Sequence, residues 1–219
     1  TLFFNFLGGT LPSGLSFSRS TGGTYFDSAG VMQMAGVGAP RFDHDPISHG
    51  VRGLLIEESR TNILLQSAAL DTTWATSNAA VTANAVISPS GGMDADTIAS
   101  QTNAAANSDS VAQSVNLQAS TTYTFSLYAK NVSSTQSRVE LNAINSGSMN
   151  KISTITWSGA VPTVSSGGTE ALGNDWYRIN LTFTTNASDA GAATVSFFPA
   201  NSATDNSGAV NVWGMQLEA

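Results

Sequence analysis

Regular alternation of apolar and polar side chains is the feature that most restricts what this chain can fold into. Residues 122–130 and 176–184 both follow this pattern without interruption. A period of two places one set of side chains on a buried face and the other in solvent, as in a β-strand covered on one side. The apolar sets are Tyr123, Phe125, Leu127 and Ala129 in the first segment, and Tyr177, Ile179, Leu181 and Phe183 in the second.

Further segments predict strands at residues 138–144, 152–157, 193–198 and 210–217. Loops rich in Gly, Ser and Asn separate them, for example at residues 165–168 and 201–208. No segment keeps a helical period, and the Ala-rich residues 103–107 are interrupted by Asn. Many short strands with turn signals between them predict an all-β sandwich or barrel.

The last predicted strand changes parity in its middle. Val210 and Val212 share one face, whereas Met215 and Leu217 fall on the other. One extra residue, a β-bulge at Gly214, would return all four side chains to a common inward face. The alternative is that both faces of this strand are covered, and the pattern alone leaves the two readings open.

Residues 1–61 differ from the rest of the chain. Short strands are expected at residues 15–18, 24–26, 31–34, 41–42 and 53–57, with turns at 27–30 and 36–38. Large apolar residues are too few there to form a separate core, so we expect this β-rich collar to pack on the sandwich of residues 62–219 or on neighbouring chains. The first residue is Thr1 rather than Met, and we expect the chain to be a piece of a longer protein.

The composition excludes several classes of function. Only 11% of the residues are charged, with a net charge of −7, and the eight basic residues do not cluster. Nucleic-acid binding needs a dense basic surface, so it is not expected, and the same scarcity argues against anionic membranes. There is no cysteine, which excludes disulfides and thiolate chemistry. No apolar run approaches the roughly 20 residues that span a bilayer.

Catalytic motifs are absent from the sequence, and we expect no enzyme activity. There is no Gly-x-Ser-x-Gly, His-Glu-x-x-His or phosphate-binding loop. The two histidines, His44 and His49, lie beside Asp43 and Asp45, either as metal ligands or in a polar turn with Asp43 capping its own backbone. Adjacent carboxylates at residues 57 and 58 point to opposite sides of a strand, so they cannot form a glycosidase pair.

The first third of the chain resembles a region found in phage tail-fibre, head-spike and minor tail proteins, including those of gene transfer agents. The resemblance rests on four strings in order: residues 16–20 (SFSRS), 23–31 (GTYFDSAGV), 40–46 (PRFDHDP) and 52–62 (RGLLIEESRTN). It implies a component of the virion surface, assembled in the bacterial cytoplasm and working outside the cell. Because such appendages are usually threefold, and because the collar has too little apolar content to close its own core, we expect a homotrimer.

The remaining two thirds resemble jelly-roll carbohydrate-binding modules. The strings are residues 62–65 (NILL), 70–71 (LD) with Trp74, 92–96 (GMDAD), 113–115 (QSV), 123–130 (YTFSLYAK), 176–179 (WYRI) and 213–218 (WGMQLE). Many of those modules hold a structural calcium ion between an early acidic residue and an aspartate pair in the last strand. Asp71 matches the first position, but Trp213 and Gly214 replace the pair, so we expect no calcium and no other cofactor.

Sugar binding requires aromatic platforms and planar hydrogen-bonding groups on an exposed surface. We expect the outward side of the central strands to carry such a site. Trp74 and Trp176 are expected at the edge of the core. The candidates of outward parity are Tyr128, Arg138, Glu140 and Asn142, and Trp157 and Trp213 are candidates of uncertain parity.

The expected function is non-catalytic attachment of a virion or particle to a bacterial surface polysaccharide. Two alternatives stay open. One is a structural module that only oligomerises or decorates the particle together with other virion proteins, and the other is a polysaccharide-degrading enzyme. The sequence does not name the sugar, the host or the position on the particle.

Overall fold

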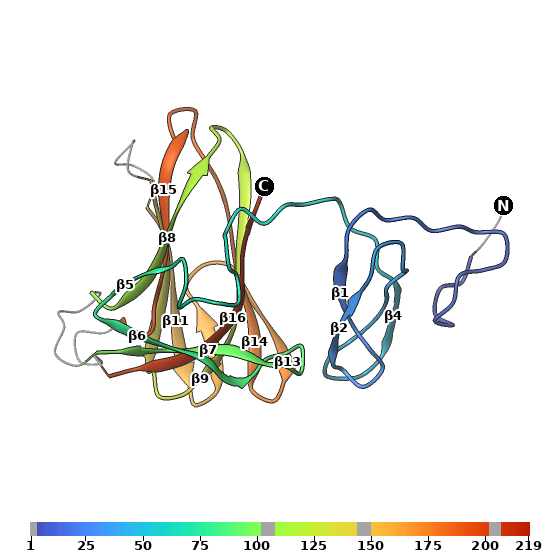
Figure 1. Ribbon diagram of the computed structural model, residues 1–219, viewed down its shortest axis with the longest axis horizontal. Coiled ribbons are helices and arrows are strands. Elements are labelled where there is room, and N and C mark those ends of the chain that lie inside the picture. Colours follow the sequence, from blue (N-terminus) through green and yellow to red (C-terminus); the bar gives the residue numbers. More distant parts are fainter. Residues whose placement is uncertain (1–3, 102–107, 144–149, 202–206) are drawn as a thin grey trace. The chain divides into compact units, whose positions relative to one another are not determined.

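The computed structural model describes residues 4–101, 108–143, 150–201 and 207–219. The regular elements in these residues are all strands (Figure 1), and they include no helix that could cross a membrane. The strands are β1 Gly23–Phe26, β2 Met32–Ala35, β3 Phe42–His44, β4 Val51–Leu54, β5 Ala75–Ser77, β6 Ala79–Ile87, β7 Met93–Ser100, β8 Ser110–Leu117, β9 Thr122–Asn131, β10 Gln136–Ala143, β11 Asn150–Ser158, β12 Val161–Val164, β13 Gly168–Gly173, β14 Trp176–Thr184, β15 Gly191–Phe198 and β16 Ala209–Glu218.

The chain divides into two compact units. The smaller comprises Thr1–Ser59 with Pro89–Gly91 and Ala171–Asn174, and the rest of the chain forms the larger unit. The main division, after Ser59, lies close to the domain boundary proposed after residue 61. Each unit is described by itself below.

The larger unit is a jelly-roll sandwich of two six-stranded sheets. One, called here the β10 sheet, has the order β12-β11-β10-β15-β8-β5, and the other, the β9 sheet, has the order β13-β14-β9-β16-β7-β6. From β7 to β10 and from β14 to β16, the chain changes sheet at every step (Figure 1). Successive strands therefore face each other across the core instead of pairing side by side, as in a jelly roll.

The core between the sheets consists of the predicted inward side chains. In β9, Tyr123, Phe125, Leu127 and Ala129 are all buried, and their partners in β14 include buried Ile179. Val139, Leu141, Ile155, Val195 and Phe197 complete the core from the β10 sheet. The all-β prediction and its inward parity are confirmed. Burial of such side chains, at roughly 1.5–3 kcal/mol each, is the main force that holds the two sheets together.

The parity change in the last strand is a β-bulge. Along β16 the pairing with β9 shifts between Trp213 and Gln216, and Gly214 has a φ of 62°. As a result Val210, Val212, Met215 and Leu217 are all fully buried. Of the two interpretations that the sequence left open, the structure has the bulge.

The smaller unit contains two two-stranded sheets, β1-β2 and β3-β4. Residues 15–18, expected to form a strand, have none, whereas the other predicted strands occur with boundaries shifted by a few residues. Polar contacts organise much of this unit. The buried Arg41 forms an ion pair with Glu57 at 2.7 Å and also donates to the carbonyl of Thr24.

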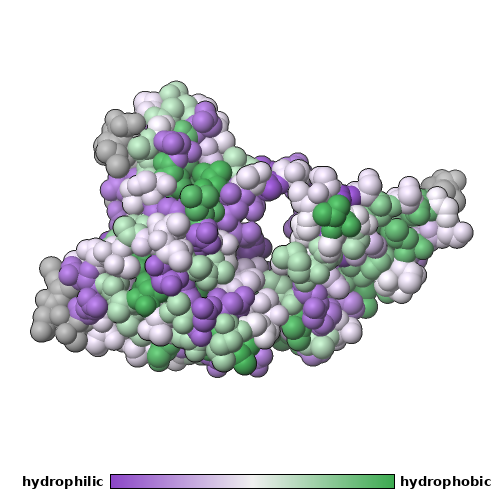
Figure 2. Space-filling view, viewed as in Figure 1, coloured by the Kyte–Doolittle hydropathy of each residue, from purple (hydrophilic) through white to green (hydrophobic). Residues whose placement is uncertain are grey.

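Apolar side chains remain on the surface of the smaller unit. Met34 and Val37 are 72% and 71% exposed, and Ile56 is 76% exposed. Met32, Ala35 and Leu172 are its buried hydrophobic residues among those described. Green apolar patches are visible on this part of the molecule in Figure 2. The unit therefore lacks a hydrophobic core comparable to that of the sandwich.

Candidate functional site

A groove of about 650 Å³ lies on the sandwich at the place where β5 begins. β5 pairs with β8 only along Ser110–Ala112, so beyond Ala112 no described strand pairs with this edge of β8. The groove is lined by Ile63, Leu65, Thr73, Ala75, Ala112, Gln113, Ser114, Val115, Asn116 and Thr194. An interrupted sheet edge of this kind offers both side chains and backbone groups to a ligand.

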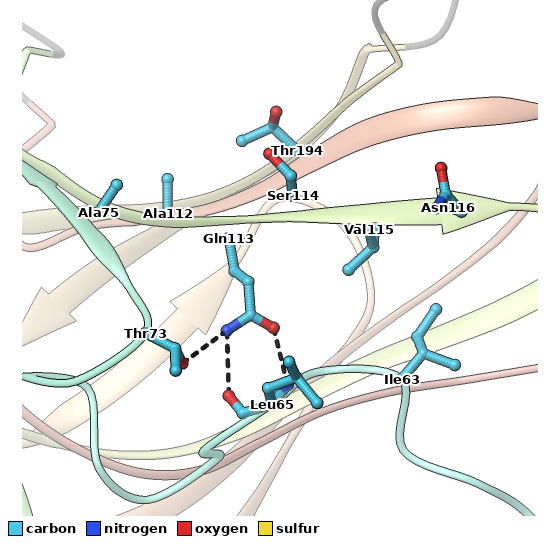
Figure 3. Close-up of a pocket in the computed structure, with 10 residues that line it drawn as sticks. All are labelled: Ile63, Leu65, Thr73, Ala75, Ala112, Gln113, Ser114, Val115, Asn116 and Thr194. Atoms are coloured by element: carbon cyan, nitrogen blue, oxygen red, sulfur yellow. Dashed lines mark hydrogen bonds between the residues drawn. The ribbon is translucent and has the colours of Figure 1, made fainter.

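Gln113 fixes the inner wall of the groove. Its side-chain oxygen accepts a hydrogen bond from the Leu65 N–H at 2.7 Å, and its side-chain nitrogen donates to the Leu65 carbonyl and to the Thr73 hydroxyl. Figure 3 shows Gln113 and Val115 pointing toward Leu65 and Ile63. This wall is apolar apart from the amide that holds it in place.

The other side of β8 carries small polar groups. Ser114 and Asn116 are exposed and point away from the Leu65 segment (Figure 3). Strand pairing places Ser114 beside Thr194 of β15, and Thr194 beside Asn142 of β10. The groove therefore opens onto a row of hydroxyl and amide side chains that crosses the outer face of the β10 sheet, with strands about 4.8 Å apart.

An ion pair lies on the same face, next to this row. The Arg138 guanidinium is 3.0 Å from the Glu140 carboxylate and lies 3.9 Å from the centroid of the Phe198 ring. The Arg138 and Glu140 side chains are only 13% and 14% exposed. Burial lowers the pKa of Arg138, and the charge of Glu140 raises it in part. The two charges are thus held together against the sheet.

The six predicted site residues do not come together. Arg138, Glu140 and Asn142 lie on the outer face of the β10 sheet, whereas Tyr128 and Trp213 pair on the outer face of the β9 sheet, with ring centroids 5.4 Å apart. The expectation of one common face is therefore corrected, because β9 and β10 follow each other in the chain but belong to opposite sheets.

Trp157 and Trp213, the tryptophans of uncertain parity, also lie in different places. Trp157 is 7% exposed, belongs to the core and donates its N–H to the Ser137 hydroxyl at 2.9 Å. It is therefore not an open sugar platform. Trp213 is half-buried on the β9 sheet. Trp74 and Trp176 are buried, as expected.

Asp43 and Asp45, the aspartates beside the two histidines, both accept hydrogen bonds from backbone N–H groups. Asp45, rather than Asp43, caps the turn after β3, through hydrogen bonds from the backbone N–H groups of Ile47 and Ser48. Asp43 accepts instead from the Phe26 N–H. The described residues hold no group of three or more His, Cys, Asp or Glu that could bind a metal ion.

The position proposed for calcium shows a different arrangement. Asp71 is exposed, and the carboxylate of the buried Asp96 accepts the N–H groups of Leu70 and Asn84 at 2.7 and 2.9 Å. Burial raises the pKa of Asp96, and those two N–H groups oppose the shift. Since the last strand supplies Trp213 and Gly214 where carboxylates would be needed, the residues present do not fit a calcium ion.

Several groove residues were not singled out from the sequence. Thr194 is an outward residue of a segment that the alternation predicted as a strand, whereas β8, which carries Ser114 and Asn116, was not predicted. Nothing in the sequence pattern distinguishes these three side chains from ordinary surface residues. Leu65 lies in a segment without regular structure. These residues come together because β5 begins only at Ala75, opposite Ala112, and only the strand pairing reveals this.

Comparison with known proteins gives similarities to solved structures at low sequence identity. No protein-family model and no curated protein matches the sequence. One similar solved structure is the enzymatically active domain of tailspike protein 4 of bacteriophage CBA120, with 11% identity over 71% of this chain and a TM-score of 0.46. The match spans 21% of that protein's chain.

Two other similar structures are carbohydrate-binding modules. A family 16 module has 16% identity over 71% of this chain and 99% of its own, with a TM-score of 0.44. The module of Cellvibrio mixtus lichenase 5A, solved with cellotriose, has 15% identity over 73% of this chain and 98% of its own, with a TM-score of 0.39. These similarities concern the fold alone.

Proposed function

We propose that this protein is a non-catalytic carbohydrate-binding module that holds a polysaccharide chain across the outer face of the β10 sheet. The observation that carries the proposal is the groove at the start of β5, with Ile63, Leu65 and Val115 on one side and Ser114 and Asn116 on the other. Sugar rings present apolar C–H faces and hydroxyl rims, and a groove of this composition can satisfy both.

The row beside the groove supports an extended ligand. Ser114, Thr194 and Asn142 stand on three successive strands. Each can donate and accept hydrogen bonds, as sugar hydroxyls do. One hydrogen-bonding group per strand, repeated at the strand spacing, suits a chain of sugar rings that runs perpendicular to the strands.

Binding of soluble polysaccharides, measured by affinity electrophoresis and on a glycan array, tests the proposal. Asn116→Ala and Thr194→Ala should each weaken binding by roughly fivefold or more, since a hydrogen bond is typically worth about 1 kcal/mol. Thr182→Ala is the matched control, because Thr182 is an exposed strand residue of the β9 sheet. Retention of full affinity by both groove variants would exclude this groove as the site.

The setting proposed for this activity is the surface of a virion or related particle, where the module attaches to a bacterial surface polysaccharide. The tail- and spike-like strings of residues 16–62 support it. Antibody labelling of purified particles tests the location. Incubation with host polysaccharide, followed by sizing of the polymer, tests the absence of catalysis, and a shortened polymer would contradict it.

A second candidate function is assembly, and the exposed apolar side chains of the smaller unit favour it. Met34, Val37 and Ile56 remain accessible in the single chain. A threefold assembly would bury them against neighbouring chains. Light scattering of the protein should then give a trimer mass, and a monomer at high concentration would contradict a trimer encoded in these residues.

A further inference from the structure

The charge of the groove face is balanced by one ion pair. Among the described outward residues of β8, β10 and β15, the charged ones are Arg138 and Glu140. The groove lining itself contains no charged side chain. The described outward residues of these three strands and the groove lining therefore carry no net charge, while the chain as a whole carries −7.

The positive charge of Arg138 is already compensated by the carboxylate of Glu140. Glu140 lies 3.0 Å from one guanidinium nitrogen, and the Phe198 ring lies below the guanidinium carbon at 3.9 Å. Guanidinium groups stay protonated in proteins, so this cation persists at every relevant pH. With both side chains largely buried, solvent screens the pair only weakly.

From this geometry we infer that the Arg138–Glu140 pair sets the charge selectivity of the face, so that the protein binds neutral polysaccharides and rejects acidic ones. The inference rests on the proposed function. A carboxylate of an acidic sugar would lose water at the face without finding an unpaired cation, which is unfavourable. The negative charge of the protein would also repel an acidic polymer at a distance.

Glu140 is the residue that keeps Arg138 neutralised. Replacing it with glutamine keeps the size and an acceptor oxygen but removes the negative charge. Arg138 then becomes an available cation beside the row of Asn142 and Thr194. A guanidinium binds a carboxylate through strong charge-assisted hydrogen bonds. Glu140→Gln should therefore gain affinity for acidic sugars.

The experiment compares each neutral polysaccharide with the same polymer after oxidation of its primary hydroxyls to carboxylates. The unmodified protein should bind the neutral polymer at least about tenfold more tightly than the oxidised one. Glu140→Gln should narrow this ratio by about tenfold, the effect of one charge-assisted hydrogen bond. The gain in affinity of Glu140→Gln for the oxidised polymer should decrease as the salt concentration is raised.

Two further variants isolate the cause. Glu218→Gln removes the same charge from β16, in the β9 sheet, and should leave the ratio unchanged. The double variant Arg138→Gln/Glu140→Gln should again reject the oxidised polymer. If Glu140→Gln loses the thermal transition of the unmodified protein, Glu140→Ser removes the same charge with a smaller side chain.

Each outcome decides the inference. A gain in affinity for the oxidised polymer that is confined to the single Glu140 variants supports it. Equal binding of both polymers by the unmodified protein would overturn it and leave polysaccharide binding intact, and an equal gain in Glu218→Gln would overturn it in favour of a net-charge effect. If no variant and no polymer bind, the proposed function and this inference fail together.

Discussion

Gly214 is the residue that lets β16 keep one buried face through its change of register. Its φ of 62° lies in the left-handed region, which residues other than glycine rarely adopt. A Cβ at this position would lie 3.0 Å from the Tyr128 ring. The bulge thus needs both the backbone freedom and the missing side chain of glycine, and the burial of Met215 and Leu217 depends on it.

Replacement of Gly214 with alanine should destabilise the sandwich by about 1–3 kcal/mol, the typical cost of a left-handed non-glycine residue with a tight contact. Urea unfolding followed by tryptophan fluorescence measures the change. Gly36→Ala is the control, because a Cβ there meets no atom within 4 Å and its φ is not positive. A Gly214→Ala variant as stable as the unmodified protein would contradict this account of the bulge.

Asn62 joins the start of the sandwich to its last strand. Its side-chain oxygen accepts the N–H groups of Leu64 and Leu217, and its side-chain nitrogen donates to the Met215 carbonyl at 3.1 Å. Asn62→Ala would leave three backbone groups without these partners, so we expect a loss of about 1–3 kcal/mol in the free energy of unfolding. The exposed neighbour Thr61→Ala should change it by less than about 0.5 kcal/mol. Equal stability of the two variants would show that water replaces the asparagine.

At the scale of elements, the β3–β4 connection depends on one carboxylate. The N–H of Ser48, then that of Ile47 and the Ser48 hydroxyl, hold the pKa of Asp45 well below its ordinary value, and Arg52 adds to the effect. A depressed folded pKa means that the carboxylate stabilises the turn fully above its unfolded pKa of about 4. This contribution is lost as pH falls through the folded pKa.

Amide-exchange protection of Ile47 and Ser48 should therefore decrease as the pH is lowered from about 5 toward 2, across the range between the unfolded and folded pKa values. Asp45→Asn cannot titrate, so its protection should be weaker at pH 5 but nearly independent of pH. The same pH dependence in Asp45→Asn would assign the effect to another group.

Alternation in the sequence predicted β9, β10, β11, β14, β15 and β16, and the buried faces of β9 and β14, because a period of two is a direct consequence of strand geometry. The other strands of the sandwich, β5 to β8, β12 and β13, were not predicted. Alternation also did not predict which sheet each strand joins. Tyr128 and Arg138 both have outward parity, but outward from β9 and outward from β10 are opposite directions. Sheet membership depends on pairing between distant strands, which parity does not encode.

The groove was hidden from the sequence for the same reason. It exists because β5 pairs with β8 only as far as Ala112, and because Gln113 ties the Leu65 segment below the remaining edge. Both features depend on contacts between residues 33 to 48 positions apart. What the sequence did contain was the composition of the face, poor in charge and rich in hydroxyl and amide groups.

At the scale of the whole molecule, the two units differ in what holds them together. The sandwich has a continuous core that includes Leu127, Phe197 and Leu217. The smaller unit has the Arg41–Glu57 ion pair and the Asp45 turn. Its buried hydrophobic residues among those described are Met32, Ala35 and Leu172. The chain contains no cysteine, so no disulfide can stabilise so small a unit. A unit of this size is marginally stable even with a good core.

Separate expression of the two parts should therefore give different behaviour. We expect residues 60–219 to retain a cooperative thermal transition, because all the core contacts of the sandwich lie within them. Residues 1–59 alone should show no cooperative transition as a monomer, since polar contacts in solvent add little net stability. Differential scanning calorimetry and light scattering on both parts check this. A cooperative transition of monomeric residues 1–59 would mean that the turn and ion-pair contacts suffice, and the exposed Met34, Val37 and Ile56 would then need no neighbouring chain to explain them.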